Sequence, residues 1–442
     1  MQAFNSAYFR DYFLNETRTA FNVRDTRSAP SIALPGASVL MNSAGAGGEL
    51  VVTDVEAAGS AAAQSNSRLL SWQTTNVMRW ASEENRHERK LALELTLDHL
   101  TVDRDPGLGE FGFNSLSDFL ASRPAFYSRT TSYIASSVNG VHTAIGIGDV
   151  YRPWRKFATQ YGVRFEGHQF DAQDPRNPLV DSAFGTRSGT LPSVVSVSPM
   201  AGFTWVIGPK DSTGYASRSR TLVGGIRDYR GLISTQSIEP LTRQNGLSSG
   251  TQQFLCEGSA VPTPMWSTFL ASPATIPQRC TDGSTGTSFA QTTPTVSLVS
   301  PAYTVSHSIR TELTWTNIFT GWITGSLRGT SAFNSGQEES YDLNFNGAPR
   351  FAVASEGGRP VYVAAADIVP ETGVMSTSDS RHSSSFAQVN ERRSDRQSRF
   401  NSITATFDYH PQMSFVSSGI NVPLSVSVHA DRLPVILKWI LE

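Results

Sequence analysis

The feature that most constrains this chain is a two-residue alternation of apolar and polar side chains. In 91–98, leucine occupies every other position, and Ala, Glu, Thr and Asp fill the positions between. The same alternation recurs near 161–168, 195–205, 309–315 and 403–409. Strands with one apolar and one polar face have this period, whereas helices repeat every 3.6 residues. The sequence therefore predicts an all-β, antiparallel protein.

The connections between the expected strands are alternately short and long. Short connections are expected near 85–90, 152–156, 208–220, 316–319 and 410–412. Long polar stretches cover 47–71, 101–139, 171–193, 231–303 and 329–399. A transmembrane β-barrel alternates brief turns with long extracellular loops, and a compact soluble domain rarely contains several structureless loops of that length. Residues 1–442 are therefore predicted to form part of a transmembrane β-barrel, with 231–303 as its long extracellular loop.

Composition agrees with a barrel wall. Charged residues make up 17% of the chain and hydrophobic residues 39%, and both shares are below those of ordinary soluble domains. A barrel tolerates this because its apolar band is spread over alternate residues and its lumen is polar. No run of apolar residues is long enough for a transmembrane helix. The net charge of −2 argues against a nucleic-acid partner.

The sequence contains none of the usual motifs for catalysis or cofactor binding. It has no P-loop, no complete G-x-G-x-x-G, no H-E-x-x-H, no C-x-x-C and no G-x-S-x-G. We therefore expect no enzyme activity, no catalytic residue, no cofactor and no metal site. His168 falls on the polar face of an expected strand, where a hydrogen bond in the lumen is the ordinary role.

Cys256 and Cys280 lie in one Ser-, Thr-, Pro- and Gly-rich segment. In an exported protein such a pair is expected to form a disulfide, which would restrict the unfolded loop by roughly 3 kcal/mol in the chain-entropy model. Two free thiols in a cytosolic protein are the alternative, since spacing alone does not establish the bond.

Aromatic residues gather beside the expected short connections. They are Tyr151 and Trp154 at one turn, Trp315 and Trp322 at another, and Tyr409 at a third. Tyrosine and tryptophan are enriched where a barrel meets the membrane interface. These five residues are therefore expected to form part of an aromatic girdle.

Three blocks of sequence resemble the barrel of TonB-dependent receptors, particularly the type with a carboxypeptidase-regulatory-like N-terminal domain. The first, at 148–167, is GDVYRPWRKFATQYGVRFEG, which is similar to that family's strand, "W-R-P" turn and "Y-G-x-R-x-[DE]" strand. The second, at 195–205, is VSVSPMAGFTW, and the third, at 111–124, is FGFNSLSDFLASRP. They resemble the family's "S-P-R-x-G-F-x-[WY]" strand and "F-x-F-x-S-L-x-D" segment, in the family's order.

The resemblance implies uptake of a scarce ligand, such as a siderophore, oligosaccharide or peptide, through the outer membrane of a Gram-negative-type bacterium. In the family, the TonB complex acts on a plug inside a barrel of about 22 strands. This sequence departs from the pattern, because no plug, TonB box, signal peptide or terminal aromatic strand is recognisable in it. We therefore expect a fragment of about half a barrel. Its expected partners are outer-membrane lipid, an unknown small ligand, and the TonB complex only through a plug absent from this chain.

Two other classes remain open. A secreted or surface-exposed β-rich binding or adhesion protein would share the alternation, but its apolar face would pack on another sheet and its strands would recur every 8 to 12 residues. An all-β hydrolase would need convergent carboxylates, or a nucleophile beside its base, which only the folded arrangement can reveal.

Overall fold

The computed structural model describes thirteen stretches of the chain. They are residues 1–9, 12–44, 50–62, 64–82, 84–131, 135–172, 176–208, 220–247, 252–283, 293–320, 323–354, 357–368 and 378–409. No helix within these stretches is long and apolar enough to cross a membrane.

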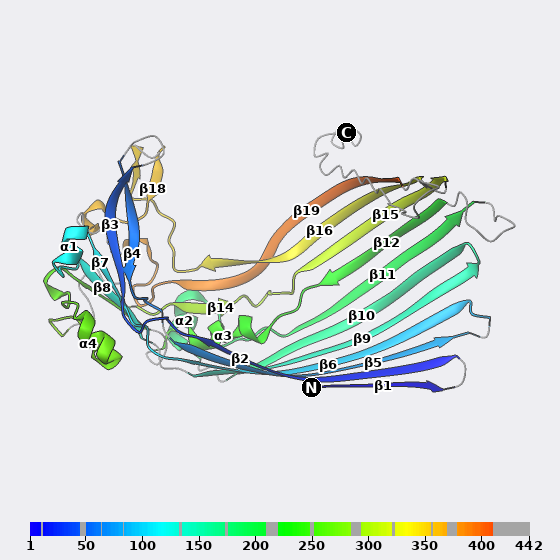
Figure 1. Ribbon diagram of the computed structural model, residues 1–442, viewed down its shortest axis with the longest axis horizontal. Coiled ribbons are helices and arrows are strands. Elements are labelled where there is room, and N and C mark those ends of the chain that lie inside the picture. Colours follow the sequence, from blue (N-terminus) through cyan, green and yellow to red (C-terminus); the bar gives the residue numbers. More distant parts are fainter. Residues whose placement is uncertain are drawn as a thin grey trace, which may run out of the picture.

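A long, curved sheet of twelve strands dominates the structure (Figure 1). Eleven strands run up and down, each antiparallel to the next, and the twelfth, β14, lies parallel to β19 at one edge. In spatial order they are β1 (Gln2–Phe9), β2 (Phe13–Ser28), β5 (Ser65–Ala81), β6 (His87–Arg104), β9 (Ser136–Trp154), β10 (Phe157–Ala172), β11 (Val194–Ile207), β12 (Arg220–Arg230), β15 (His307–Thr320), β16 (Ile323–Asp342), β19 (Val389–Tyr409) and β14 (Val296–Val299). The prediction of an antiparallel all-β fold is confirmed.

The predicted alternation of short and long connections is also confirmed. Five shorter connections separate strand ends on the right of Figure 1, and they span 10–12, 82–86, 155–156, 208–219 and 321–322. Five longer ones separate the strand ends at the other side of the sheet, and they span 29–64, 105–135, 173–193, 231–306 and 343–388. All five short connections therefore fall on the same side of the sheet, as in a barrel with turns at one rim and loops at the other.

Some expected boundaries are wrong. The short connection expected at 316–319 lies inside β15, which continues to Thr320. The long stretch expected at 329–399 is shorter than predicted, because β16 extends to Asp342 and β19 begins at Val389. The hairpin of β1 and β2 was not expected from the alternation, and the connection expected at 410–412 lies outside the described residues.

Three of the long connections contribute strands to a second, five-stranded sheet, which we call the cap. Its spatial order is β13-β8-β7-β3-β4. The strands are β3 (Gly36–Ala44), β4 (Leu50–Ala58), β7 (Glu110–Phe113), β8 (Phe126–Thr131) and β13 (Gln252–Glu257), accompanied by α1 (Leu116–Leu120) and α4 (Trp266–Ala271). Phe111, Tyr127 and Phe269 are completely buried in its core. In their described residues these connections are thus folded, and not the structureless loops that their polar composition predicts.

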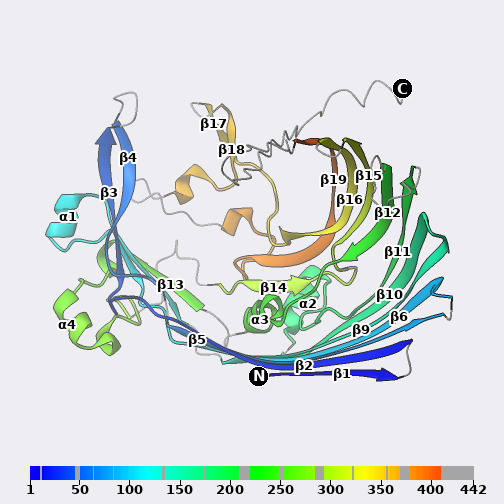
Figure 2. The ribbon, with the colours of Figure 1, turned by 45° about the vertical axis from the view of Figure 1, so that its right-hand side comes forward.

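The other elements are short. They are α2 (Pro178–Phe184), α3 (Thr235–Arg243), the 3-10 turns η1 (Gly258–Ala260), η2 (Pro273–Thr275), η4 (Ala365–Asp367) and η5 (Ser378–Ser380), and the hairpin of β17 (Phe351–Val353) and β18 (Arg359–Val361). Figure 2 shows α2, α3 and β14 inside the curve of the large sheet. Ile238 and Leu241 of α3 pack on Val138 of β9, so side chains on the Val138 side of β9 face the concave side of the sheet.

Register places apolar side chains on the convex face. Leu93, Ile145, Phe165 and Val197 form one row across β6, β9, β10 and β11. They are large apolar residues, yet 38 to 52% of each is exposed. In a soluble sandwich such a row would be packed against a second sheet. An uncovered apolar row is instead the arrangement of a strand that faces lipid.

The apolar band has a height suited to a bilayer. Along β9 it runs from Val141, beside Leu97 and Trp72, to Asp149. These eight residue steps extend roughly 27 Å along a strand. At a strand tilt of about 40° they cover about 20 Å of membrane thickness, close to the band of about 25 Å in outer-membrane barrels.

The convex face of β2 and β5 departs from this pattern. The amide of Asn76 donates to Asn15 Oδ1 at 2.9 Å and to Thr17 Oγ1 at 2.7 Å. The hydroxyls of Thr19 and Thr74 lie 3.2 Å apart. These polar groups bond largely to one another, which reduces the cost of placing them away from water. Their presence explains why the hairpin of β1 and β2 has no visible apolar alternation.

The large sheet is not closed into a barrel within the described residues. There, β1 pairs with β2 alone. At the other edge, β14 covers β19 only along Val389–Arg392. The structure is therefore an open, curved portion of a barrel wall, in agreement with the predicted fold class.

Candidate functional site

The centre of the concave face is hollowed because four inward positions carry no side chain. Gly148 and Gly162 lie opposite each other on β9 and β10, and Gly202 and Gly225 do so on β11 and β12. A Cβ on Gly162 would come within 2.7 Å of the Ile147 carbonyl oxygen. Glycine inside a strand often marks close approach of a backbone or a ligand. Here the glycines allow the strands to pair closely, and they leave space on the concave face that side chains would otherwise fill.

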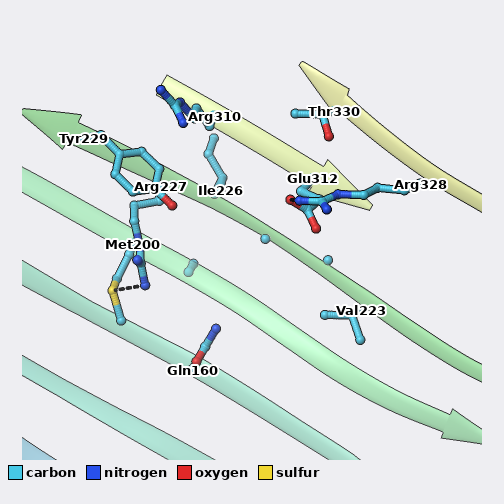
Figure 3. Close-up of a pocket in the computed structure, with 13 residues that line it drawn as sticks. Gln160, Met200, Val223, Ile226, Arg227, Tyr229, Arg310, Glu312, Arg328 and Thr330 are labelled. Atoms are coloured by element: carbon cyan, nitrogen blue, oxygen red, sulfur yellow. Dashed lines mark hydrogen bonds and ion pairs between the residues drawn. The ribbon is translucent and has the colours of Figure 1, made fainter. Parts of the chain in front are cut away.

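Two adjoining hollows, of about 390 and 550 Å³, lie on this part of the wall, and Gly225 lines the first and Gly148 the second. Gln160, Met200, Arg227 and Tyr229 line both of them, and we call the combined depression the groove. Figure 3 shows one part, where side chains of β12, β15 and β16 gather above the strands. The groove lies on the polar face of the wall, where a transported solute would pass.

Most carboxylates in the groove are already paired. Arg164 binds both carboxylate oxygens of Glu94, at 2.6 and 2.8 Å, and donates to Glu166 at 2.7 Å. Across the groove, Arg328 donates to Glu312 at 2.5 Å. The acids are thus held by wall arginines, and Glu94 and Glu166 share Arg164.

Arg227 and Arg310 have different surroundings. They are directly opposite each other on β12 and β15. Their guanidinium carbons lie 5.4 and 5.0 Å from the centroid of the Tyr229 ring. Arg227 donates to the Met200 sulfur at 3.2 Å, and Arg310 donates to Ser308 Oγ at 3.1 Å. Neither arginine forms an ion pair in the part of the chain that the structure describes.

A buried polar cluster adjoins the groove toward the loop end. His142 and His168 stack with ring centroids 4.5 Å apart, and His142 Nε2 lies 3.7 Å from a Glu166 oxygen. Nε2 of His168 and the hydroxyls of Ser196 and Ser198 have no hydrogen-bond partner among the described residues. The hydrogen bond expected for His168 is therefore not made through Nε2. No group of three or more His, Cys, Asp or Glu in the described stretches is arranged to hold a metal ion.

Helix α3 crosses the concave side above this cluster. Glu239, which is 3% exposed, accepts hydrogen bonds from Ser136 Oγ at 2.9 Å and from Arg243 at 3.2 Å. On the other side, Arg392 of β19 donates to the Ser237 carbonyl at 3.0 Å. The helix thus connects the β9 part of the wall with the β19 part and narrows the concave space at the loop end.

The expected girdle residues have different positions. Tyr151 stacks on His87, with ring centroids 4.4 Å apart, and Trp154 stacks on Phe157 at 5.0 Å, both at the short-turn end. Trp315 lies inside β15 and not beside a turn, because the strand continues past it. Trp322 is outside the described residues, and Tyr409, the last residue of β19, pairs with Ile323.

Asp149 also lies near the short-turn end, on the convex face. Its carboxylate accepts a hydrogen bond from the Tyr161 hydroxyl at 2.8 Å and lies 2.7 Å from His87 Nδ1. A carboxylate in this row interrupts the alternation of Ile145 and Ile147. Both aromatic partners contact Oδ2, and Oδ1 has no hydrogen-bond partner among the described residues.

Cys256 and Cys280 are joined by a disulfide within the cap. The bond lies in the same core as Phe111, Tyr127 and Phe269. Arg129, on β8, donates to the carbonyl of Gly107 at 2.7 Å and to those of Ile276 and Pro277 at 2.8 Å each. Burial raises the pKa of the Tyr127 hydroxyl, which stays a neutral donor to the Pro277 carbonyl at 3.2 Å. The segment around Cys280 is therefore held by covalent and polar contacts together.

Replacing both cysteines, as Cys256→Ala with Cys280→Ala, is expected to lower the free energy of unfolding of the cap by about 2 kcal/mol. This is below the usual chain-entropy value because the sheet strands already tether both ends of the segment. Limited proteolysis of residues 252–283 should reveal faster cleavage in the double variant. A Ser259→Ala variant serves as the control. Equal cleavage in all three proteins would contradict a stabilising role.

No protein-family model and no curated protein matches the sequence. Among solved structures, the chain is similar to the outer-membrane transporter YddB of Escherichia coli, with 8% identity, a TM-score of 0.48, and coverage of 92% of this chain and 39% of that one. It is also similar to the siderophore receptor PirA of Pseudomonas aeruginosa, with 10% identity, a TM-score of 0.32, and coverage of 93% and 60%.

The ferric enterobactin receptor PfeA of Pseudomonas aeruginosa, solved as a mutant, is a further similar structure. It has 9% identity and a TM-score of 0.34, and the match covers 93% of this chain and 49% of that one. The chain thus spans between 39 and 60% of the lengths of these three proteins. The structure itself is an open, up-and-down antiparallel β wall with one apolar and one polar face.

Proposed function

We propose that this chain forms part of the wall of an outer-membrane transporter of the TonB-dependent kind. Its convex face contacts lipid, and its concave groove and cap meet the ligand. The observation that carries the proposal is the row of Leu93, Ile145, Phe165 and Val197, which is apolar, exposed and continuous across four strands. Such a row in water would favour aggregation, whereas in a bilayer it is stable.

The proposed mechanism is binding and passage, without bond-making. The cap is the outermost folded part and would meet a scarce ligand first, and the groove would receive it on the inner wall. The proposed ligand is a siderophore, an oligosaccharide or a peptide. The TonB complex would act through a plug that occupies the concave side. The girdle role of Tyr151 and Trp154 belongs to this proposal, because both aromatic residues lie at one end of the apolar band.

The alternative of a secreted binding or adhesion protein is less well supported. It requires the convex apolar row to be covered, and within the described residues that row is exposed. It also predicts regular strand spacing, whereas the observed connections alternate between short and long.

Fractionation of the producing cells tests the proposed location. An antibody against residues 258–283 of the cap is expected to detect the protein in the outer-membrane fraction. The band should change its gel mobility on boiling, because folded barrels resist detergent until they are heated. Recovery in the soluble or secreted fraction would contradict the proposal and favour the binding-protein alternative.

A further inference from the structure

The Arg227 and Arg310 pair is electrostatically unfavourable as it stands. Like charges directly opposite on neighbouring strands destabilise a sheet. The neighbouring wall arginines Arg164 and Arg328 each have a carboxylate partner, and this pair has none among the described residues. The Tyr229 ring attracts both guanidinium groups, but a cation–π contact supplies no countercharge.

A third cation lies farther along the same row of the wall. In register, Lys90, Gly148, Gly162, Met200, Arg227 and Arg310 follow one another across six strands. Lys90 lines the larger hollow together with Arg227 and forms no ion pair in the described part of the chain. Between the two cationic ends, the glycines leave only Met200 to fill space. The row is therefore an open trough with positive charge at each end.

None of the acids that line the groove forms an ion pair with these three cations among the described residues. Glu88 accepts from Arg152 at 2.9 Å, Glu94 binds Arg164, and Glu312 binds Arg328. Each of these carboxylates already binds an arginine, and Glu94 shares Arg164 with Glu166. An anionic group that binds in the trough would therefore receive hydrogen bonds from cations that have no carboxylate partner in the described stretches.

We propose that the trough binds an anionic solute through Arg227 and Arg310, with Lys90 at its far end. This inference rests on the proposed function and specifies the ligand class for the same groove. Guanidinium groups bind carboxylates and phosphates through paired, charge-assisted hydrogen bonds, so the solute carries a carboxylate or a phosphate. A neutral oligosaccharide would leave the repulsion between the two arginines in place.

The test uses the full chain folded in detergent micelles, with succinate, inorganic phosphate and glucose as separate probes. Isothermal titration is expected to detect succinate or phosphate but not glucose. Arg227→Gln and Arg310→Gln should each weaken that binding about tenfold or more, because each removes a charged hydrogen-bond donor. Arg68→Gln is the matched control: Arg68 is exposed, pairs with Asp25 and does not line the groove. It should bind like the unmodified protein.

A second measurement separates binding from folding. Without any anion, Arg310→Gln should melt at the same temperature as the unmodified protein or higher, because the substitution removes the repulsion. Equal affinity in the unmodified protein and both groove variants would overturn the inference, as would a response to glucose equal to that of the anions. A response to succinate alone identifies a carboxylate ligand, and a response to phosphate alone identifies a phosphate ligand.

The failure of this inference can be distinguished from failure of the proposed function. A protein that fractionates with the outer membrane but responds to neither anion contradicts the anionic ligand only. A protein absent from the outer membrane contradicts the transporter proposal, whatever the titration shows.

Discussion

Phe111→Ala is expected to lower the free energy of unfolding of the cap by roughly 3 to 5 kcal/mol, the usual cost of removing a buried phenylalanine ring. Phe111 is completely buried. Its ring stacks on Tyr127 at 4.2 Å and lies 5.5 Å from Trp266 and 6.3 Å from Phe269. The rings of Phe111 and Tyr127 belong to the connection 105–135, and those of Trp266 and Phe269 belong to the connection 231–306. The substitution would therefore weaken the contact that joins separate connections into one sheet.

Hydrogen exchange of the amides in β7 and β8 measures this effect. Those amides should exchange much faster in Phe111→Ala, while the amides of β9 and β10 in the large sheet should change little. Leu120→Ala is the control, because Leu120 is 76% exposed on α1 and should cost less than about 0.5 kcal/mol. If both variants exchange alike, the aromatic core does not hold the cap together.

Ile145→Arg is the second change with a large expected effect. Ile145 lies in the middle of the apolar band and is 52% exposed. Arginine there should cost roughly 2 to 4 kcal/mol in a bilayer, where the charge must leave water. The matched control is Val52→Arg in the cap, where Val52 is 63% exposed and outside the proposed membrane layer.

Urea titration of the protein folded into phosphatidylcholine vesicles measures both variants. The free energy of unfolding should fall clearly for Ile145→Arg. For Val52→Arg it should stay within about 0.5 kcal/mol of the value for the unmodified protein. Equal and small effects are the outcome expected of a water-soluble protein, and they would contradict a lipid-facing role for the convex side.

The wall was largely predictable from the sequence because its strands are locally marked. The leucines of β6 and the apolar residues of β10, β11, β15 and β19 alternate visibly, and alternation alone assigns each to one face. The hairpin of β1 and β2 escaped prediction because Asn15 and Thr17 occupy convex positions that are apolar on most other strands. The turn misplaced at 316–319 has no glycine or proline, whereas Gly321 follows it in the sequence.

The cap and the groove could not be predicted in the same way. Phe111, Tyr127 and Phe269 looked like isolated aromatics in polar loops, because they become a core only when separate connections meet. The groove depends on strand register, which brings Lys90 into one row with Arg227 and Arg310. The one local signal was glycine inside expected strands, at Gly148 and Gly162, since such glycines often mark a close approach.

The central claim, that the convex face lies in lipid and the concave face in water, is tested most directly with spin labels at Ile145 and Gly146. These neighbours point to opposite faces of β9, and a side chain fits at Gly146, where the nearest atom to an added Cβ is 3.9 Å away. Each position is changed to cysteine and labelled with a nitroxide in vesicle-embedded protein. The account predicts that molecular oxygen relaxes the label at 145, while a water-soluble nickel chelate relaxes the label at 146. Equal access of the nickel chelate to both labels would contradict it.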